Sequence, residues 1–230
     1  RATYLLGDKK AAIEDYSNAI KINTTHAQAY YYRGGINFEN KEYQKAIEDF
    51  TQAIAQKSDY AYAYNDRDSD KKMLENYTGA KDDYEKAVKI NPSLAFVFNN
   101  LGSVKKKLED YAGALEDYTT AVKIDPSYYI AFNNRGSVKI ELEDYEGAIE
   151  DFNKAIQLKP DYAYAFNNRG NAKYKLKQYE SALEDYNKAI SLDSEYGYAF
   201  LNRGITKEMM RDAVGACEDW KKAASLGISN

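Results

Sequence analysis

The sequence has few of the residues that build disulfides, metal sites or membrane spans. Among 230 residues there is one cysteine, Cys217, and one histidine, His26. A single cysteine excludes an internal disulfide and leaves the redox compartment and the localisation open. We expect Cys217 to pack as a small apolar side chain. There is no run of about 18 apolar residues, so no membrane insertion is expected.

Motifs for catalysis and cofactor binding are missing as well. The sequence has no serine, histidine and aspartate in a triad-like pattern, no cluster of metal ligands and no glycine-rich phosphate loop. His26 is isolated and has no obvious partner for acid–base chemistry. We therefore predict a protein that is not an enzyme and that uses no cofactor and no metal.

Basic charge is not in excess. Lysine and arginine number 32 against 36 aspartates and glutamates, which gives a net charge of −4 at pH 7. Surfaces for nucleic acids or anionic membranes normally carry a basic excess, so neither partner is expected. Aromatic and amide side chains also suit RNA bases, which keeps RNA binding as an alternative that the acidic balance disfavours.

Repetition dominates the sequence. A glycine, or one substitute for it, recurs every 34 residues without insertion or deletion, at Gly34, Asp68, Gly102, Gly136, Gly170 and Gly204. A strict period of this size is typical of stacked identical units. We predict one domain, 1–230, that consists of a partial repeat at 1–26 and full repeats at 27–60, 61–94, 95–128, 129–162, 163–196 and 197–230.

Each full repeat has the pattern of two amphipathic helices. In the repeat 163–196 a turn is expected at Lys177 and Gln178, and the second helix has one apolar stripe formed by Ala182, Leu183, Tyr186, Ala189 and Ile190. Prolines stand at equivalent points between repeats, at Pro92, Pro126 and Pro160, where they end one helix before the next begins. No alternation of period two occurs, so the predicted fold class is all-α.

This helix-turn-helix unit resembles the tetratricopeptide repeat (TPR). In the repeat 163–196 the matching residues are Phe166, Gly170, Ala172, Tyr179, Ala182, Tyr186 and Ala189, and Pro160 matches in the preceding linker. The resemblance covers the whole chain. It implies a right-handed superhelical solenoid whose first helices line a concave groove, and a protein or peptide partner in that groove.

A helical wheel places asparagines on the side of each first helix that faces away from the second helix. Two residues before the glycine stand Asn100, Asn134, Asn168 and Asn202, which we call the outer asparagines. Three residues before it stand Asn65, Asn99, Asn133 and Asn167, the inner asparagines. Six residues before it stand aromatic side chains, at Tyr62, Phe96, Tyr164 and Tyr198.

Asparagine is a mediocre helix former, so its recurrence at these sites needs a reason. Its amide offers donors and an acceptor and can bind the N–H and C=O of an extended peptide together. The row of outer asparagines resembles the ladder in the TPR superhelix of O-linked N-acetylglucosamine transferase, which holds peptides in that way. The row is interrupted at Asp66 and Tyr32. We predict that both asparagine rows and the aromatic row bind peptide. The alternatives are that one asparagine of each pair caps or bridges to a neighbouring helix, that the repetition only reflects duplication of the repeat, and that the aromatic row packs between repeats.

Charged residues also fall on the groove side, where they would select among peptides: Lys72, Lys106, Lys107, Lys175, Glu39, Glu141 and Glu208. On the opposite side, an arginine precedes the glycine at Arg33, Arg67, Arg135, Arg169 and Arg203, and each second helix has an aspartate. We predict arginine–aspartate bridges, because the guanidinium fork suits a carboxylate. The alternative is a solvated charged face.

Two further expectations concern irregular parts of the array. Asp68 and Asp70 replace small residues in the repeat 61–94, which predicts a frayed helix or hinge there. The chain starts in the middle of a repeat, and no capping helix follows Ile228. We therefore expect a piece of a longer protein, or ends that pack on other molecules, and self-assembly into a homo-oligomer is the alternative function.

Overall fold

The structure is a computed structural model that describes residues 8–73 and 76–228. Every regular element in these residues is an α-helix, which confirms the predicted all-α class. The chain groups into two compact units, Arg1–Asp110 and Tyr111–Asn230. Each unit is described by itself below, and the prediction of one domain over 1–230 stays a prediction.

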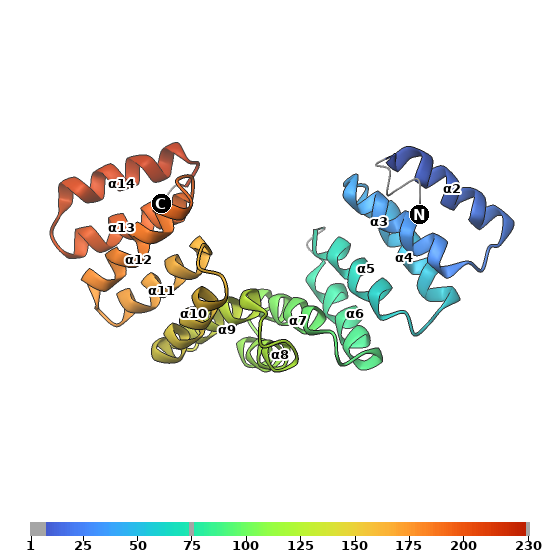
Figure 1. Ribbon diagram of the computed structural model, residues 1–230, viewed down its shortest axis with the longest axis horizontal. Coiled ribbons are helices and arrows are strands. Elements are labelled where there is room, and N and C mark those ends of the chain that lie inside the picture. Colours follow the sequence, from blue (N-terminus) through green and yellow to red (C-terminus); the bar gives the residue numbers. More distant parts are fainter. Residues whose placement is uncertain (1–7, 74–75, 229–230) are drawn as a thin grey trace. The chain divides into compact units, whose positions relative to one another are not determined.

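Unit 1 consists of helices that pack consecutively on one another (Figure 1). They are α2 (Lys9–Ile22), α3 (Ala27–Glu39), α4 (Tyr43–Gln56), α5 (Ala61–Met73), α6 (Tyr77–Ile90) and α7 (Ala95–Lys107). Helices α3 and α4 fall within the predicted repeat 27–60, and α5 and α6 fall within 61–94. The side chains of Asp68 and Asp70 lie outside the described residues, so the hinge expected there is not tested.

Unit 2 repeats the same arrangement (Figure 1). Its helices are α8 (Tyr111–Ile124), α9 (Tyr129–Glu141), α10 (Tyr145–Leu158), α11 (Ala163–Lys175), α12 (Tyr179–Leu192), α13 (Gly197–Met209) and α14 (Ala213–Ser225). The hairpins α9–α10, α11–α12 and α13–α14 fall within the predicted repeats 129–162, 163–196 and 197–230. The period read from the sequence therefore gives the helix pairs correctly.

The turns after α3, α7, α9, α11 and α13 use a left-handed backbone conformation seven residues after the glycine, at Lys41, Glu109, Glu143, Lys177 and Arg211. In the repeat 163–196 this residue is Lys177, with a φ of 60°. Its N–H donates to the Tyr174 carbonyl at 2.9 Å, and the Gln178 N–H donates to the Lys173 carbonyl at 2.9 Å. These bonds satisfy the last carbonyls of α11 and start α12 two residues later. The predicted turn at Lys177 and Gln178 is confirmed.

The core contains a recurring contact between a glycine of a first helix and an aromatic ring of the second helix in the same repeat. Phe152 and Tyr186 are almost fully buried, and their rings lie against Gly136 and Gly170. A Cβ on Gly170 would stand 2.7 Å from Cε1 of Tyr186. Alanines of the second helices, such as Ala182 and Ala189, are fully buried and let the helices approach closely. Cys217, by contrast, is exposed, so the expectation that it packs is wrong.

Candidate functional site

The two asparagine rows differ in burial. The inner side chains Asn65, Asn99, Asn133 and Asn167 are 3–6% exposed. The outer side chains Asn100, Asn134, Asn168 and Asn202 are half-buried. The outer row is therefore the one whose amides reach solvent, and the inner row lies beneath it.

The rows are joined by hydrogen bonds between amides. In unit 2, Asn202 Nδ2 donates to Asn167 Oδ1 at 2.9 Å, and Asn168 Nδ2 donates to Asn133 Oδ1 at 3.0 Å. Within one helix the inner amide donates to the outer one, from Asn167 to Asn168 at 3.2 Å and from Asn133 to Asn134 at 3.4 Å. We call this chain of amides the amide relay. It confirms that asparagines bridge to a neighbouring helix.

The amide relay has one direction and leaves hydrogen-bonding capacity unused. Each Nδ2 that crosses between helices points toward the preceding repeat, and the relay therefore runs from α13 to α9. An asparagine amide has two donor hydrogens and two acceptor lone pairs. Asn168 uses one donor and one lone pair in the relay, so one of each is left for a ligand.

Unit 1 has a shorter version of this pattern. Asn100 Nδ2 donates to Asn65 Oδ1 at 3.1 Å. One repeat further toward the N-terminus, the equivalent pair joins Asp66, at the outer position of the repeat 61–94, to Tyr31, at the inner position of the repeat 27–60. Asp66 accepts from the Tyr31 hydroxyl at 2.6 Å and from Asn65 Nδ2 at 2.9 Å, so it ends the pattern as an acceptor.

The aromatic row borders the asparagines. Tyr62, Tyr164 and Tyr198 are 46–55% exposed, and Phe96 is half-buried. Tyr62 stacks on Phe96 with ring centroids 6.0 Å apart, and Tyr164 lies 4.8 Å from Tyr196. The row therefore both packs between repeats and presents ring faces to solvent.

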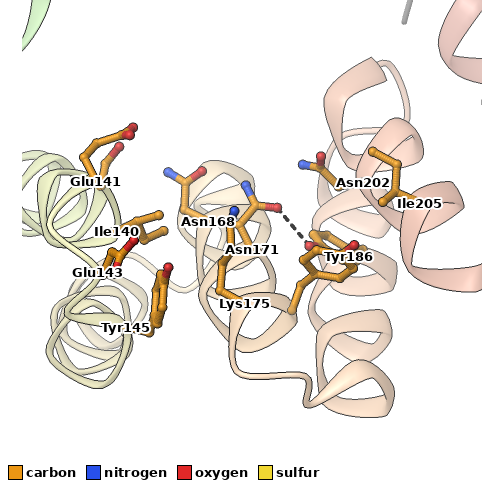
Figure 2. A pocket seen from close by; sticks show the side chains of 12 residues that line it. Ile140, Glu141, Glu143, Tyr145, Asn168, Asn171, Lys175, Tyr186, Asn202 and Ile205 are labelled. Carbon is orange, nitrogen blue, oxygen red and sulfur yellow. Dashed lines mark hydrogen bonds between the residues drawn. The ribbon is translucent and has the colours of Figure 1, made fainter. Parts of the chain in front are cut away.

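A cavity of about 500 Å³ opens over the amide relay in unit 2. Figure 2 shows Asn168, Asn171 and Lys175 on α11 at its centre, with Glu141 on α9 and Asn202 on α13 at its sides. The buried Tyr186 reaches its floor and donates its hydroxyl to Asn171 Oδ1 at 2.8 Å. The lining is mostly amide, hydroxyl and charged groups, which suits a polar extended ligand.

The opposite side of the first helices holds the arginine–aspartate bridges, and the prediction is confirmed. In five of the repeats an arginine Nη2 lies 2.5–2.6 Å from an aspartate Oδ1 of the second helix, in the pairs Arg33–Asp49, Arg67–Asp83, Arg135–Asp151, Arg169–Asp185 and Arg203–Asp219. The aspartate side chains are 2–7% exposed, which excludes a solvated face.

Lysines that the sequence analysis did not pair complete these bridges. Lys139 Nζ lies 3.0 Å from Asp151 Oδ2, and the same contact is made by Lys173 with Asp185 at 2.8 Å. Burial opposes ionisation of Asp219, but hydrogen bonds from Arg203 and Lys207 lower its pKa below the usual value. The signal in the sequence was a lysine four residues after Arg67, Arg135, Arg169 and Arg203, one helical turn away. Asn37 takes this place after Arg33 and donates to Asp49 at 3.0 Å.

Some of these arginines also join two repeats. Arg169 Nη1 donates to Asn153 Oδ1 of the preceding repeat at 2.6 Å, and Arg203 makes the same bond to Asn187. The guanidinium carbons stand 5.4–5.8 Å from an aromatic ring three residues earlier, in Arg33, Arg67, Arg135, Arg169 and Arg203. These contacts fix the guanidinium against a ring of its own helix.

Comparisons with known proteins agree on the repeat type. Family models described as tetratricopeptide repeat or TPR repeat match residues 4–61, 73–94, 95–128, 136–177 and 163–196. A search of curated protein sequences gave no match. None of the helices in the described part of the chain is both long and apolar enough to cross a membrane.

Solved structures share the fold. YrrB, described as a TPR protein with an unusual peptide-binding site, is 27% identical with a TM-score of 0.69, over 81% of this chain and 96% of YrrB. A TPR protein from Parabacteroides merdae is 19% identical with a TM-score of 0.78, over 100% of this chain and 91% of its own. The Cut9–Hcn1 structure is 16% identical with a TM-score of 0.80, over 97% of this chain and 44% of its own.

Proposed function

The chain belongs to the tetratricopeptide repeat family, and from this premise we propose that it is a non-catalytic scaffold that binds extended peptide segments along its first helices. Proteins with these repeats generally act as protein-interaction scaffolds. The observation that supports peptide binding here is the amide relay, which leaves outer amides oriented and accessible. The resemblance to YrrB, with its unusual peptide-binding site, points the same way.

The roles of the two asparagine rows differ in this proposal. The outer asparagines contact the ligand backbone, and the inner asparagines hold them in place from below. Because the inner row fixes the outer amides before binding, little conformational entropy is lost when a peptide arrives. Tyr62, Phe96, Tyr164 and Tyr198 offer ring faces to apolar side chains of the same ligand. Backbone contacts of this kind bind many sequences, so the aromatic and charged side chains give the selectivity.

The first test removes the outer amides. We expect Asn100→Ala, Asn134→Ala, Asn168→Ala and Asn202→Ala together to weaken capture of peptides from an immobilised random library at least about 30-fold. Four rungs at about 0.5–1.5 kcal/mol each amount to roughly 2–6 kcal/mol. The matched control is Asn153→Ala with Asn187→Ala, which removes amides that accept from arginine outside the site. Capture that is unchanged in the quadruple variant contradicts the proposal, provided that circular dichroism shows both variants folded.

The direction of the amide relay also predicts the direction of the ligand. Figure 2 shows the Asn168 nitrogen on the side of α9 and its oxygen on the side of α13. In an extended strand the N–H and C=O of one residue project to the same edge of the strand, and the N–H lies nearer the N-terminus of the peptide. The peptide N–H donates to Asn168 Oδ1 on the α13 side, and the peptide C=O accepts from Asn168 Nδ2 on the α9 side. The N-terminal end of the peptide therefore lies toward α13, and the peptide runs antiparallel to the order of the repeats.

Paramagnetic labelling tests this direction in unit 2. A captured peptide with a nitroxide at its N-terminus is expected to broaden amide signals of α13 more than those of α9, and a C-terminal nitroxide is expected to do the reverse. Equal broadening by both labelled peptides, or the opposite preference, contradicts the direction while leaving peptide binding itself intact.

Self-assembly is the competing function. Exposed apolar side chains such as Ile22 on α2 and Val214 on α14 favour it. Light scattering over a range of protein concentrations separates the two functions. A constant monomer mass in a sample that captures peptides supports the scaffold, and a mass that rises with concentration in a sample that captures none supports self-assembly.

A further inference from the structure

A second cavity lies in unit 1, where the asparagine ladder is interrupted. Its volume is about 190 Å³, and it is lined by Tyr16, Tyr31, Tyr32, Gly35, Ile36, Glu39 and Asp66. The residues come from α2, α3 and α5. Tyr31 and Tyr32 stand at the positions that asparagines occupy in later repeats. We call this cavity the tyrosine cage.

Three aromatic rings form its walls. Tyr16 stacks on Tyr32 with centroids 5.7 Å apart, and Tyr31 meets Tyr32 edge-on at 5.5 Å with an interplanar angle of 63°. Tyr31 is held further by Tyr60 at 4.8 Å. The rings of Tyr16, Tyr31 and Tyr32 all line the same cavity, and Tyr31 is tilted relative to Tyr32. The faces carry the negative end of the ring quadrupole, which attracts cations.

Asp66 adds a carboxylate to this wall. It accepts hydrogen bonds from the Tyr31 hydroxyl and Asn65 Nδ2, and no cation pairs with it among the described side chains. Burial raises its pKa, and those two hydrogen bonds act in the opposite direction. A carboxylate in a partly desolvated site gains more from a nearby positive charge than an exposed carboxylate does.

The remaining lining residues decide how much room and charge the cage has. Glu39 is paired with Lys9, whose Nζ lies 2.9 Å from Oε2, so it contributes less negative charge than Asp66. Gly35 leaves one wall open, since a Cβ there would have no atom within 4 Å. Serine, asparagine or isoleucine stands at the equivalent position of the later repeats.

From this arrangement we propose that the tyrosine cage binds the positively charged end of a lysine or arginine side chain, with Asp66 as its counter-charge. Tyr16, Tyr31 and Tyr32 surround the alkyl stem and the cation, and Asp66 accepts its N–H groups. This inference goes beyond the peptide scaffold, because it concerns a side-chain pocket in the repeats that lack the ladder. It needs no bound peptide to be tested.

The experiment is a titration of the full chain followed by amide chemical shifts. The probes are Nα-acetyl-lysine methylamide and Nα-acetyl-arginine methylamide, with the norleucine and citrulline analogues as uncharged counterparts. We expect the charged probes to shift the Gly35 and Asp66 amide signals with at least about tenfold higher affinity than the uncharged probes. Equal affinity for charged and uncharged probes overturns the proposal.

Three variants locate the binding. Asp66→Asn keeps the shape of the side chain and is expected to lower the affinity for the charged probes about tenfold, because a charge-assisted bond becomes a neutral one. Gly35→Leu fills open space in the cage and is expected to abolish binding. Glu48→Gln is the matched control, since it removes one exposed carboxylate from α4 in the same unit and is expected to change nothing.

Each outcome has a defined meaning. Unchanged affinity in Gly35→Leu overturns the proposal even if Asp66→Asn fails to fold. A tenfold loss in Glu48→Gln overturns it as well, because net charge would then explain the binding. The protein could bind the charged probes and still capture no library peptide. That result contradicts the scaffold function and leaves the tyrosine cage supported.

Discussion

Asp151→Ala is expected to destabilise the fold by about 3–5 kcal/mol, because it leaves the cations of Arg135 and Lys139 facing each other without their carboxylate. Those two side chains are each 17% exposed, so water compensates for little of the lost attraction. Urea denaturation followed by circular dichroism measures the change, with the transition midpoint as the direct observable.

The control for this variant is Glu150→Ala, which removes the exposed carboxylate next to Asp151 on α10. Its cost is expected to stay within roughly 0–1 kcal/mol. Arg135→Leu is expected to fall between the two, since Leu101 shows that a leucine packs at the equivalent position of another repeat. If Asp151→Ala lowers the free energy of unfolding no more than Glu150→Ala does, the bridges do not contribute to stability.

Gly170→Val is expected to cost about 3 kcal/mol, near the upper end of the usual range for overpacking a core. Its Cβ would stand 2.7 Å from a ring carbon of Tyr186, and that ring cannot move freely because its hydroxyl is bonded to Asn171. For a chain of this length the change corresponds to a fall in the melting temperature of roughly 6–12 °C. Differential scanning calorimetry measures it.

Gly35 provides the matched control for that substitution. It is also a glycine of a first helix, but a Cβ there meets no atom within 4 Å. Gly35→Ala is expected to stabilise the helix by roughly 0.5–1 kcal/mol, the ordinary advantage of alanine over glycine. Comparable losses for Gly35→Val and Gly170→Val would show that helix propensity, and not the contact with Tyr186, explains the cost of replacing Gly170.

The helices and their pairing could be read from the sequence because they depend on local patterns. The recurrence of Gly136, Gly170 and Gly204 gives the period, and the stripe through Ala182 and Tyr186 gives the buried face of a helix. The arginine–aspartate pairs were also predictable, since both partners lie within one repeat, 16 residues apart. Short spacings between rigid elements leave few possible partners.

The amide relay and the tyrosine cage were decided by the tertiary structure. Asn168 meets Asn133 across 35 residues, and Tyr31 meets Asp66 across the same interval, so both contacts depend on how one hairpin turns on the next. A helical wheel shows which face an asparagine occupies, but the rotation between hairpins decides whether its amide meets solvent or another amide. The sequence by itself determined the helices and the face of each helix that carries the asparagines. Only the packing of successive repeats determined which of those amides are buried and bonded to one another and which reach solvent.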